Sequence, residues 1–351
     1  MKQWTVAPEK ILIRGTNWVG DAVMSIPAMT EIRRLFPKAH IALLVRPWVK
    51  DIYSAAPFID EIIEFDKSGT HRGWSGLRRL VRSLRERRFD TAFLLQNAFD
   101  AALLAWLAGI PERIGYRRDA RGWLLTQGVE VPEPGDIPRH ERFYYLELLR
   151  RAGWMERFPE CDAIRFEGIA EARSAGARHL SALGLAGPVI GISPGAAYGN
   201  AKRWLPERFA EVAQSLPSSV VVVFGSASER ELCQTVAAQI PGARNLAGET
   251  TLREFIDLAA ACRLFLTNDS GAMHVASALG VPTLTIFGAT DDTTTGPTGP
   301  LARVIREHAE CSPCLLRECP IDHRCMTRVT APRVAAEARQ LAGQWTLEPK
   351  S

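Results

Sequence analysis

Short apolar runs alternate with helical patterns along almost the whole chain, and this alternation limits the folds open to it more than any other feature. Strands that alternate with helices form parallel sheets with helices on both faces, because each crossover returns the chain to the same end of the sheet. The 351 residues are too many for one ordinary hydrophobic core and suit two domains. We therefore expect two doubly wound α/β domains.

The periodicity of the apolar residues predicts the individual elements. In the first half we expect strands at 10–14, 40–45, 61–65 and 91–96, and helices at 21–36, 76–88, 101–108 and 140–152. In the second half we expect strands at 188–193, 219–225, 263–267 and 282–287, and helices at 206–216, 229–239, 252–262 and 272–279. The pattern weakens over 153–168, so we predict an N-terminal domain at 1–160, a C-terminal domain at 161–330, and a final segment, 331–351, whose helix at 331–341 packs back on the N-terminal domain.

Composition and charge exclude several classes of protein. The net charge of +4 is too mild to argue for nucleic-acid binding, and 46% hydrophobic with 23% charged residues is a globular composition. The first ten residues lack the apolar core of a signal peptide, and no apolar run is long enough to cross a bilayer. The seven cysteines, an odd number, argue against a disulfide framework. We expect a cytosolic protein without a nucleic-acid partner.

The segment 264–287 is the most informative short stretch, because it has the pattern strand, turn, helix, strand. Its turn contains Asp269, Ser270 and Gly271, and either Asp269 or Ser270 is suited to cap the following helix. Free backbone N–H groups and the positive end of a helix dipole suit a phosphate group. An ordinary capped turn is the alternative interpretation of the same residues.

Three more turns follow predicted strands, at the sheet edge where doubly wound folds bind ligands. The turn 14–21 ends at Asp21, which is either a base that accepts a proton from a hydroxyl or a residue that only favours the start of a helix. The turn 193–204 carries Lys202 and Arg203, which could bind a diphosphate or be solvated at the surface. The turn 224–229 ends at Glu229, which could hold ribose hydroxyls or only favour the start of a helix.

The sequence has no G-x-x-x-x-G-K-[ST] or G-x-G-x-x-G motif and no prominent Asp-x-Asp pair. We therefore predict that helix ends and Lys202 handle a diphosphate without a metal ion or another cofactor.

Four cysteines are concentrated near the C-terminus, and their function stays open at this point. They could ligate Zn²⁺ or iron, or they could be free or partly oxidised thiols, because their spacing is not a standard zinc pattern. They are Cys311, Cys314, Cys319 and Cys325, with His308 and His323 nearby.

These motifs together resemble glycosyltransferase family 9, the ADP-heptose–lipopolysaccharide heptosyltransferases, over nearly the whole chain. The resemblance rests on Gly20-Asp21, Pro194-Gly195 with Lys202-Arg203-Trp204, the turn from Asp269 to His274, and Phe287-Gly-Ala-Thr290 with Gly296-Pro297. Within the family, 16–21 and the cysteine segment are most similar to the members that add the second heptose of the inner core.

The resemblance implies a GT-B fold, two Rossmann-like domains facing a central cleft, and an inverting, metal-independent transfer of heptose from ADP-heptose. It assigns Asp21 as the catalytic base. The residues that it assigns to the donor are Lys202, Glu229, Asp269, Ser270, Gly271 and His274. The acceptor would be a lipid-anchored, anionic lipopolysaccharide core, reached from the cytoplasm by peripheral contact with the inner membrane.

Residues 72–88 hold seven arginines against one acid, Glu86. An anionic acceptor gives a purpose to the arginine-rich helix predicted at 76–88, and a solvated helix face is the alternative interpretation. The individual residues that we expect to contact the acceptor are Asn17, Arg117, Arg121 and His140. Two alternatives stay open: a relative that uses another acceptor or sugar, and a sensor that binds a sugar nucleotide without catalysis.

Overall fold

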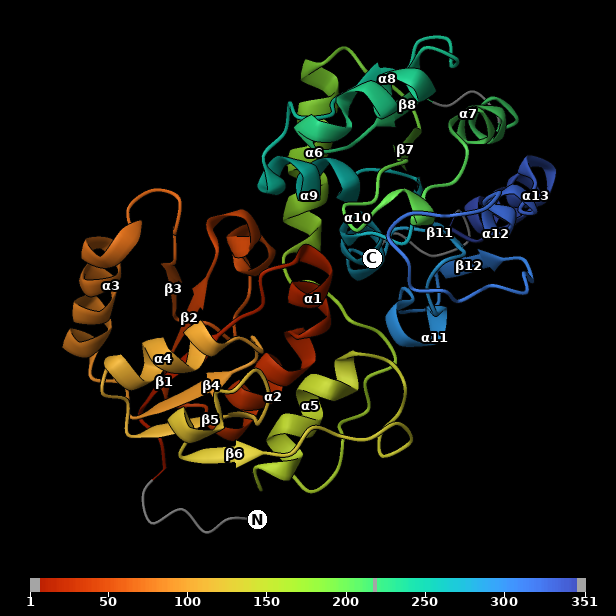
Figure 1. The fold of residues 1–351 in the computed structure, drawn as a ribbon. Helices are drawn as coiled ribbons and strands as arrows, with labels where there is room; N and C mark the ends of the chain where they lie inside the picture. Colours follow the sequence, from red (N-terminus) through yellow and green to blue (C-terminus); the bar gives the residue numbers. More distant parts are fainter. Residues whose placement is uncertain (1–6, 217–219, 346–351) are drawn as a thin grey trace. The chain divides into compact units, whose positions relative to one another are not determined.

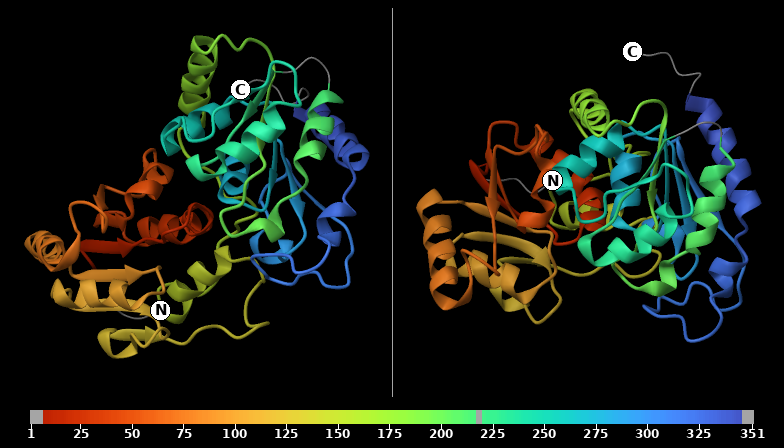
Figure 2. Two further views of the ribbon diagram at one scale, coloured as in Figure 1. Left: turned by 45° about the horizontal axis from the view of Figure 1, so that its top comes forward. Right: turned by 90° about the horizontal axis from the view of Figure 1, so that it is seen from above.

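The computed structural model describes residues 7–216 and 220–345, and the chain divides into two compact units, residues 1–161 and 162–351. Figure 1 labels the elements, and Figure 2 gives two further views. Each unit contains a six-stranded sheet in which every pairing is parallel, in the orders β3-β2-β1-β4-β5-β6 and β12-β11-β10-β7-β8-β9. Counted from its own first strand, each sheet has the strand order of a Rossmann fold.

The first unit begins with the buried strand β1, which pairs with β2 and β4 at the centre of the sheet. Its strands are β1 (Lys10–Arg14), β2 (His40–Val45), β3 (Glu61–Glu64), β4 (Thr91–Leu94), β5 (Glu112–Tyr116) and β6 (Gln127–Val129). Its helices are α1 (Val19–Met24), α2 (Ile26–Leu35), η1 (Pro47–Tyr53), α3 (Gly73–Arg87), α4 (Phe99–Leu107), η2 (Gly122–Leu124) and α5 (Arg142–Arg151), where η marks a 3₁₀-helix.

The second unit has the same arrangement around β7 and β10. Its strands are β7 (Val189–Ser193), β8 (Val220–Val223), β9 (Arg244–Asn245), β10 (Leu264–Asn268), β11 (Thr283–Phe287) and β12 (Ala302–Arg306). Its helices are α6 (Ile169–Ala182), η3 (Asn200–Lys202), α7 (Pro206–Gln214), η4 (Ala227–Glu229), α8 (Arg230–Ala237), α9 (Leu252–Ala260), α10 (Gly271–Ala278), α11 (Asp292–Thr295), α12 (Arg324–Thr327) and α13 (Ala331–Trp345). The final helix, α13, contacts α7 and β10 of this unit.

The eight predicted strands are present, although the predicted start of one, residue 219, lies outside the described residues, as does the end of the chain, 346–351. The single helix predicted at 21–36 is wrong, because the chain forms α1 and α2 with a break at Ser25. Pro27 lacks an N–H group, so a continuous helix would lose a hydrogen bond at this point. The Ser25 hydroxyl donates to the Ala22 carbonyl and the backbone restarts as α2.

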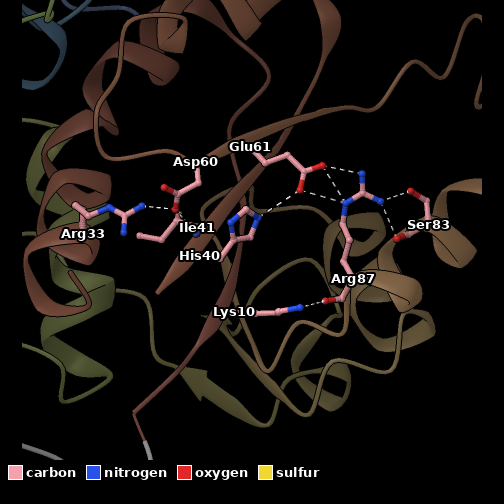
Figure 3. A network of polar contacts seen from close by, with 8 residues as sticks. All are labelled: Lys10, Arg33, His40, Ile41, Asp60, Glu61, Ser83 and Arg87. Carbon is pink, nitrogen blue, oxygen red and sulfur yellow. Dashed lines mark hydrogen bonds and ion pairs between the residues drawn. The ribbon is translucent and has the colours of Figure 1, made fainter. Parts of the chain in front are cut away.

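The start of the strands in the first unit is held by ion pairs (Figure 3). The Arg87 guanidinium donates to the Glu61 carboxylate at 2.7 Å, and the carboxylate also lies 3.4 Å from the His40 ring. These partners lower the pKa of Glu61. Arg33 pairs with Asp60, whose carboxylate also accepts the Ile41 N–H group. Doubly wound folds bind ligands at the carboxyl ends of their strands, and this network lies at the opposite ends, so we assign it to the stability of the fold.

None of the helices within residues 7–216 and 220–345 is long and apolar enough to cross a membrane.

Candidate functional site

In the second unit, three turns that follow neighbouring strands meet at Asp269. The Lys202 ammonium donates to Asp269 Oδ2 at 2.6 Å, and the Thr290 hydroxyl donates to the same oxygen at 2.6 Å. Asp269 and Thr290 are buried, and Lys202 is only slightly exposed. The structure thus brings together the predicted lysine and aspartate and adds Thr290, to which sequence reasoning assigned no function.

Hydrogen bonds fix the lysine turn on the sheet. The Asn268 side chain accepts the Trp204 N–H group at 3.0 Å and donates to the Pro194 carbonyl at 2.7 Å. The Lys202 ammonium also lies 4.8 Å from the centre of the Tyr198 ring, a cation–π distance. Lys202 is therefore held between a carboxylate and an aromatic face, in a position from which its charge can reach an anion.

The helix α10 begins directly after this cluster. Ser270 is its N-cap residue, but its side chain makes no capping hydrogen bond and instead lies 3.2 Å from the Thr267 hydroxyl. The first N–H groups of α10 are therefore left without a side-chain cap, which suits an anionic ligand. Gly271 is the first residue of the helix, and His274 is buried one turn later.

Glu229 lies at the same edge of the sheet and has a structural function that is visible in its contacts. Its carboxylate accepts hydrogen bonds from the Ser226 N–H group and hydroxyl, at 2.9 and 2.7 Å, and forms a capping box. A Cβ atom on Gly195 would lie 2.1 Å from Glu229 Oε1. The turns after β7 and β8 are therefore in contact, with the carboxylate directly above the glycine backbone.

The cysteine segment supports the lysine turn from outside. Tyr198 donates its hydroxyl hydrogen to the Leu315 carbonyl at 2.8 Å, and the Ala201 N–H group donates to the Arg317 carbonyl at 3.0 Å. The Arg317 guanidinium lies 5.3 Å from the Tyr198 ring. Sequence reasoning did not detect this function, because nothing in the cysteine spacing points to the turn 193–204.

The cysteines of this segment are free thiols around one small cavity of about 60 Å³. Burial and the neighbouring thiols raise the pKa of Cys325. Among the described residues, no group of three or more His, Cys, Asp or Glu side chains is arranged to hold a metal ion.

In the first unit, Asp21 lies in the first turn of α1, the helix that follows the carboxyl end of β1 after a short loop. Burial raises the pKa values of Tyr53, Tyr145 and Glu141, and the charge of Asp21 is close enough to add to all three shifts. Burial, followed by the charge of Asp21, raises the pKa of Glu141 to about 7, while Arg118 opposes the shift. A buried carboxyl group whose pKa is raised beside a second carboxyl group is typical of functional sites. Sequence reasoning missed Glu141, because it precedes α5 without any motif.

A polar network continues from Glu141 along the edge of this sheet. The Tyr144 hydroxyl accepts a hydrogen bond from the Asn97 amide at 2.7 Å and also contacts Arg118, whose pKa it raises. Arg121 donates to Asn97 Oδ1 at 2.8 Å and to the Tyr116 and Gln96 carbonyl groups. Arg121 is fully buried, and burial lowers its pKa to about 10. An acceptor could reach Arg121 only if this network opened.

The other predicted acceptor contacts lie in different surroundings. Asn17 accepts a hydrogen bond from the buried Arg14 at 2.9 Å, and its carbonyl accepts the Trp48 indole N–H at 2.8 Å. Arg117 is exposed and pairs with Glu130 at 3.0 Å. His140 precedes α5, where its ring accepts the Arg142 N–H group at 3.2 Å. Asn17 is thus held by hydrogen bonds through both its side chain and its backbone.

Known proteins resemble the chain in sequence and in fold. A family model described as glycosyltransferase family 9 (heptosyltransferase) matches residues 77–324. Lipopolysaccharide heptosyltransferase 2 of Escherichia coli K12 is 35% identical over 308 residues, which cover 85% of this chain and 88% of that protein.

Solved structures give the same result. The structure of Escherichia coli ADP-heptose LPS heptosyltransferase II has a TM-score of 0.80 and 32% identity, and covers 95% of this chain and 99% of that one. A family 9 glycosyltransferase from Veillonella parvula has a TM-score of 0.82 at 23% identity, covering 96% and 98%. The two parallel sheets and these matches confirm the expected GT-B fold class.

Proposed function

Because the chain belongs to glycosyltransferase family 9, the heptosyltransferases, we propose that it transfers L-glycero-D-manno-heptose from ADP-heptose to the first heptose of the lipopolysaccharide inner core. The chain is a glycosyltransferase, and members of this class use a nucleotide-sugar donor. The names of its relatives, heptosyltransferase 2 and ADP-heptose LPS heptosyltransferase II, support this donor and this acceptor.

The observation that carries the proposal is the cluster of Lys202, Asp269 and Thr290 in front of the uncapped helix α10. A diphosphate at this edge would meet the Lys202 ammonium and the first N–H groups of α10, including that of Gly271. Both interactions strengthen as charge develops on the leaving ADP, so they favour the transition state over the bound donor.

The sugar end of the donor would lie against the remaining polar groups of this edge. Asp269 accepts hydrogen bonds from sugar hydroxyls, and the Ser270 hydroxyl and the His274 imidazole complete the turn. Glu229 contacts the ribose with the carboxylate oxygen that faces Gly195. The second unit is thus the donor-binding unit, and no metal ion or other cofactor takes part in the proposed mechanism.

The first unit presents the acceptor in this proposal. Asp21 accepts the proton of the acceptor hydroxyl while that oxygen bonds to the anomeric carbon, and the bond from that carbon to the ADP phosphate oxygen breaks. Attack opposite the leaving group inverts the anomeric centre. Asn17, Arg117 and His140 contact the acceptor, and Arg121 acts through Asn97, which it holds in place.

The acceptor is anchored in a membrane by its lipid, so we place the reaction in the cytoplasm, at the inner face of the inner membrane, with peripheral contact by the protein.

The test is ADP release from ADP-heptose with two acceptors, Kdo-lipid A with one heptose and the same molecule without it. Turnover only with the heptosylated acceptor is the expected result. Turnover only with the bare acceptor would reassign the chain to the first heptose transfer. Donor binding without ADP release from either acceptor would favour another acceptor or a non-catalytic sugar-nucleotide sensor.

A further inference from the structure

The first unit exposes several large aromatic side chains. Four of them lie on helices of one sheet face: Trp74 on α3, Phe99 and Trp106 on α4, and Trp123 on η2, with exposed fractions of 78%, 40%, 48% and 69%. The Trp123 ring lies 6.2 Å from the Phe99 ring and 6.4 Å from the Trp106 ring, centre to centre. Scattered exposed hydrophobic residues need no explanation, but a cluster of contacting aromatic rings indicates a binding surface.

Arginines extend this aromatic cluster along α3. Trp74, Arg78, Arg82 and Arg85 are spaced by four, four and three residues, so they share one side of the helix. That side faces α4, because Arg85 Nε donates to the Leu107 carbonyl at the end of α4, at 2.8 Å. Figure 1 shows α3 and α4 next to each other on the sheet. We call the seven residues Trp74, Arg78, Arg82, Arg85, Phe99, Trp106 and Trp123 the α3–α4 surface.

The framework under this surface is rigid. Leu80 and Leu84 of α3 pack in the same hydrophobic core as Leu104 of α4 and Leu124 of η2. The Lys67–Asp100 ion pair ties the segment before α3 to the start of α4. The aromatic and basic side chains are therefore presented by fixed helices and need no ordering of the backbone on binding.

The charge of this surface is positive and unbalanced. Arg87, on another side of α3, is paired with Glu61 (Figure 3). By contrast, Arg78 and Arg82 are exposed and form no ion pair with any described acidic side chain. Glu86 is the only acidic residue in the sequence 72–88. Exposed tryptophans beside arginines are suited to the headgroup region of a bilayer, where the indole rings insert and the guanidinium groups bind anionic lipids.

We propose that the α3–α4 surface docks the first unit on an anionic lipid bilayer. The binding itself is independent of the reaction, but its benefit rests on the proposed function, since docking would bring the enzyme to a lipid-anchored acceptor. The position of the arginines favours a bilayer over the acceptor saccharide. The helix α3 runs away from the carboxyl edge of the sheet, where Asp21 lies. Its last residue, Arg87, accepts a hydrogen bond from Lys10 at the start of β1, which is the opposite edge of the sheet.

The direct test is sedimentation of the full chain with vesicles of phosphatidylcholine alone or with phosphatidylglycerol. We expect binding to the anionic vesicles and weaker binding as salt is added, through screening. Replacing two charges (Arg78→Gln with Arg82→Gln) should weaken binding roughly 25-fold. Replacing two rings (Trp106→Ser with Trp123→Ser) should weaken it at least about tenfold and reduce quenching of tryptophan fluorescence by brominated lipid. The matched control, Arg178→Gln with Arg244→Gln, removes two exposed charges of the second unit and should bind like the parent.

Activity separates this inference from the proposed function. The surface variants should keep the parent kcat/KM on a deacylated, water-soluble acceptor and lose activity only on acceptor embedded in anionic vesicles. Vesicle binding without transfer would overturn the proposed function and leave the docking surface intact. Equal binding to both vesicle types, unchanged binding by the variants, or a raised KM for the soluble acceptor would overturn the docking proposal, and the last result would assign the arginines to the saccharide.

Discussion

Lys202 and Asp269 are 67 residues apart in the sequence, yet their side chains form a 2.6 Å ion pair at the carboxyl ends of two neighbouring strands, β7 and β10. The pair is largely buried, and Thr290 donates to the same carboxylate oxygen. A buried pair contributes little net stability, but removal of one partner leaves an uncompensated charge. Lys202 is held beside the start of α10, where its ammonium group can exchange the Asp269 carboxylate for a phosphate group as its partner.

Lys202→Met should lower kcat/KM for the donor by about 10²–10³ and weaken ADP binding, because one cationic contact to the diphosphate is lost. It should also destabilise the second unit by about 3–5 kcal/mol, since the buried Asp269 side chain would lose its cationic partner. The double variant Lys202→Met with Asp269→Asn should recover most of that stability without recovering ADP affinity. Calorimetric ADP titration and thermal unfolding measure the two effects separately. Normal ADP affinity in the single variant would remove Lys202 from the donor site.

Asp21→Ala should lower kcat by about 10²-fold or more, in line with the loss of a general base, and leave ADP binding intact. Asp21→Asn preserves the size of the side chain and should be equally impaired. Pre-steady-state ADP release, with circular dichroism as a check of folding, is the suitable measurement. A folded Asn variant with near-normal turnover would show that another group accepts the proton.

The neighbouring Glu141 predicts a particular dependence of stability on pH. Its pKa is raised from the ordinary 4.5 to about 7 in the folded protein, first by burial and then by Asp21. Between these values the folded state holds a proton that the unfolded state has released, so the contribution of Glu141 to stability falls as pH rises from about 4.5 to about 7.

Glu141→Gln removes this titration. The melting temperature of the variant relative to the parent should therefore rise by a few degrees between pH 5 and pH 8. In Asp21→Asn, the pKa of Glu141 should move back toward its ordinary value, which nuclear magnetic resonance can follow. A pH-independent difference between the variant and the parent would contradict the raised pKa.

The sequence predicted the central strands of both sheets well, because β1, β2, β7 and β10 are short apolar runs buried on both faces. It missed β5, β6, β9 and β12, which lie toward the sheet edges and contain polar or glycine residues. It also missed α6, whose buried positions are Ala172, Gly176 and Leu180. A Cβ atom on Gly176 would lie 1.9 Å from the Asp257 carbonyl oxygen, so close packing replaces the usual apolar stripe.

The candidate site was predictable only where its chemistry is local. The positions of Asp21, Lys202 and Asp269 follow from turns after strands, because parallel strands bring their carboxyl ends to one edge. Glu141 could not be found in this way, since its relation to Asp21 arises from the packing of α5. No pattern in the sequence predicts that Arg121 is buried either, because an arginine among polar residues is ordinarily exposed.

Substitution of Gly195 helps to distinguish a structural function of Glu229 from a nucleotide-binding function. A methyl group at Gly195 would collide with the Glu229 carboxylate and displace it from the Ser226 capping box. Gly195→Ala should cost about 1 kcal/mol through the lost cap and should also block the backbone approach of the nucleotide.

Glu229→Ala removes the same cap but leaves the space above Gly195 open. Ser226→Ala removes the hydroxyl hydrogen bond to Glu229 and weakens the cap, but it keeps the carboxylate and its hydrogen bond from the backbone N–H group of residue 226. If Glu229 contacts the ribose, ADP affinity should fall in Glu229→Ala and Gly195→Ala and stay near normal in Ser226→Ala, while thermal unfolding shows a loss of stability in all three. If Glu229 acts only as a cap, Glu229→Ala and Ser226→Ala should have the same small effect on ADP affinity. All three variants weaken the same helix cap, but they differ in whether the Glu229 carboxylate remains beside residue 195. Their ADP affinities therefore decide whether this carboxylate binds the nucleotide or only caps the helix.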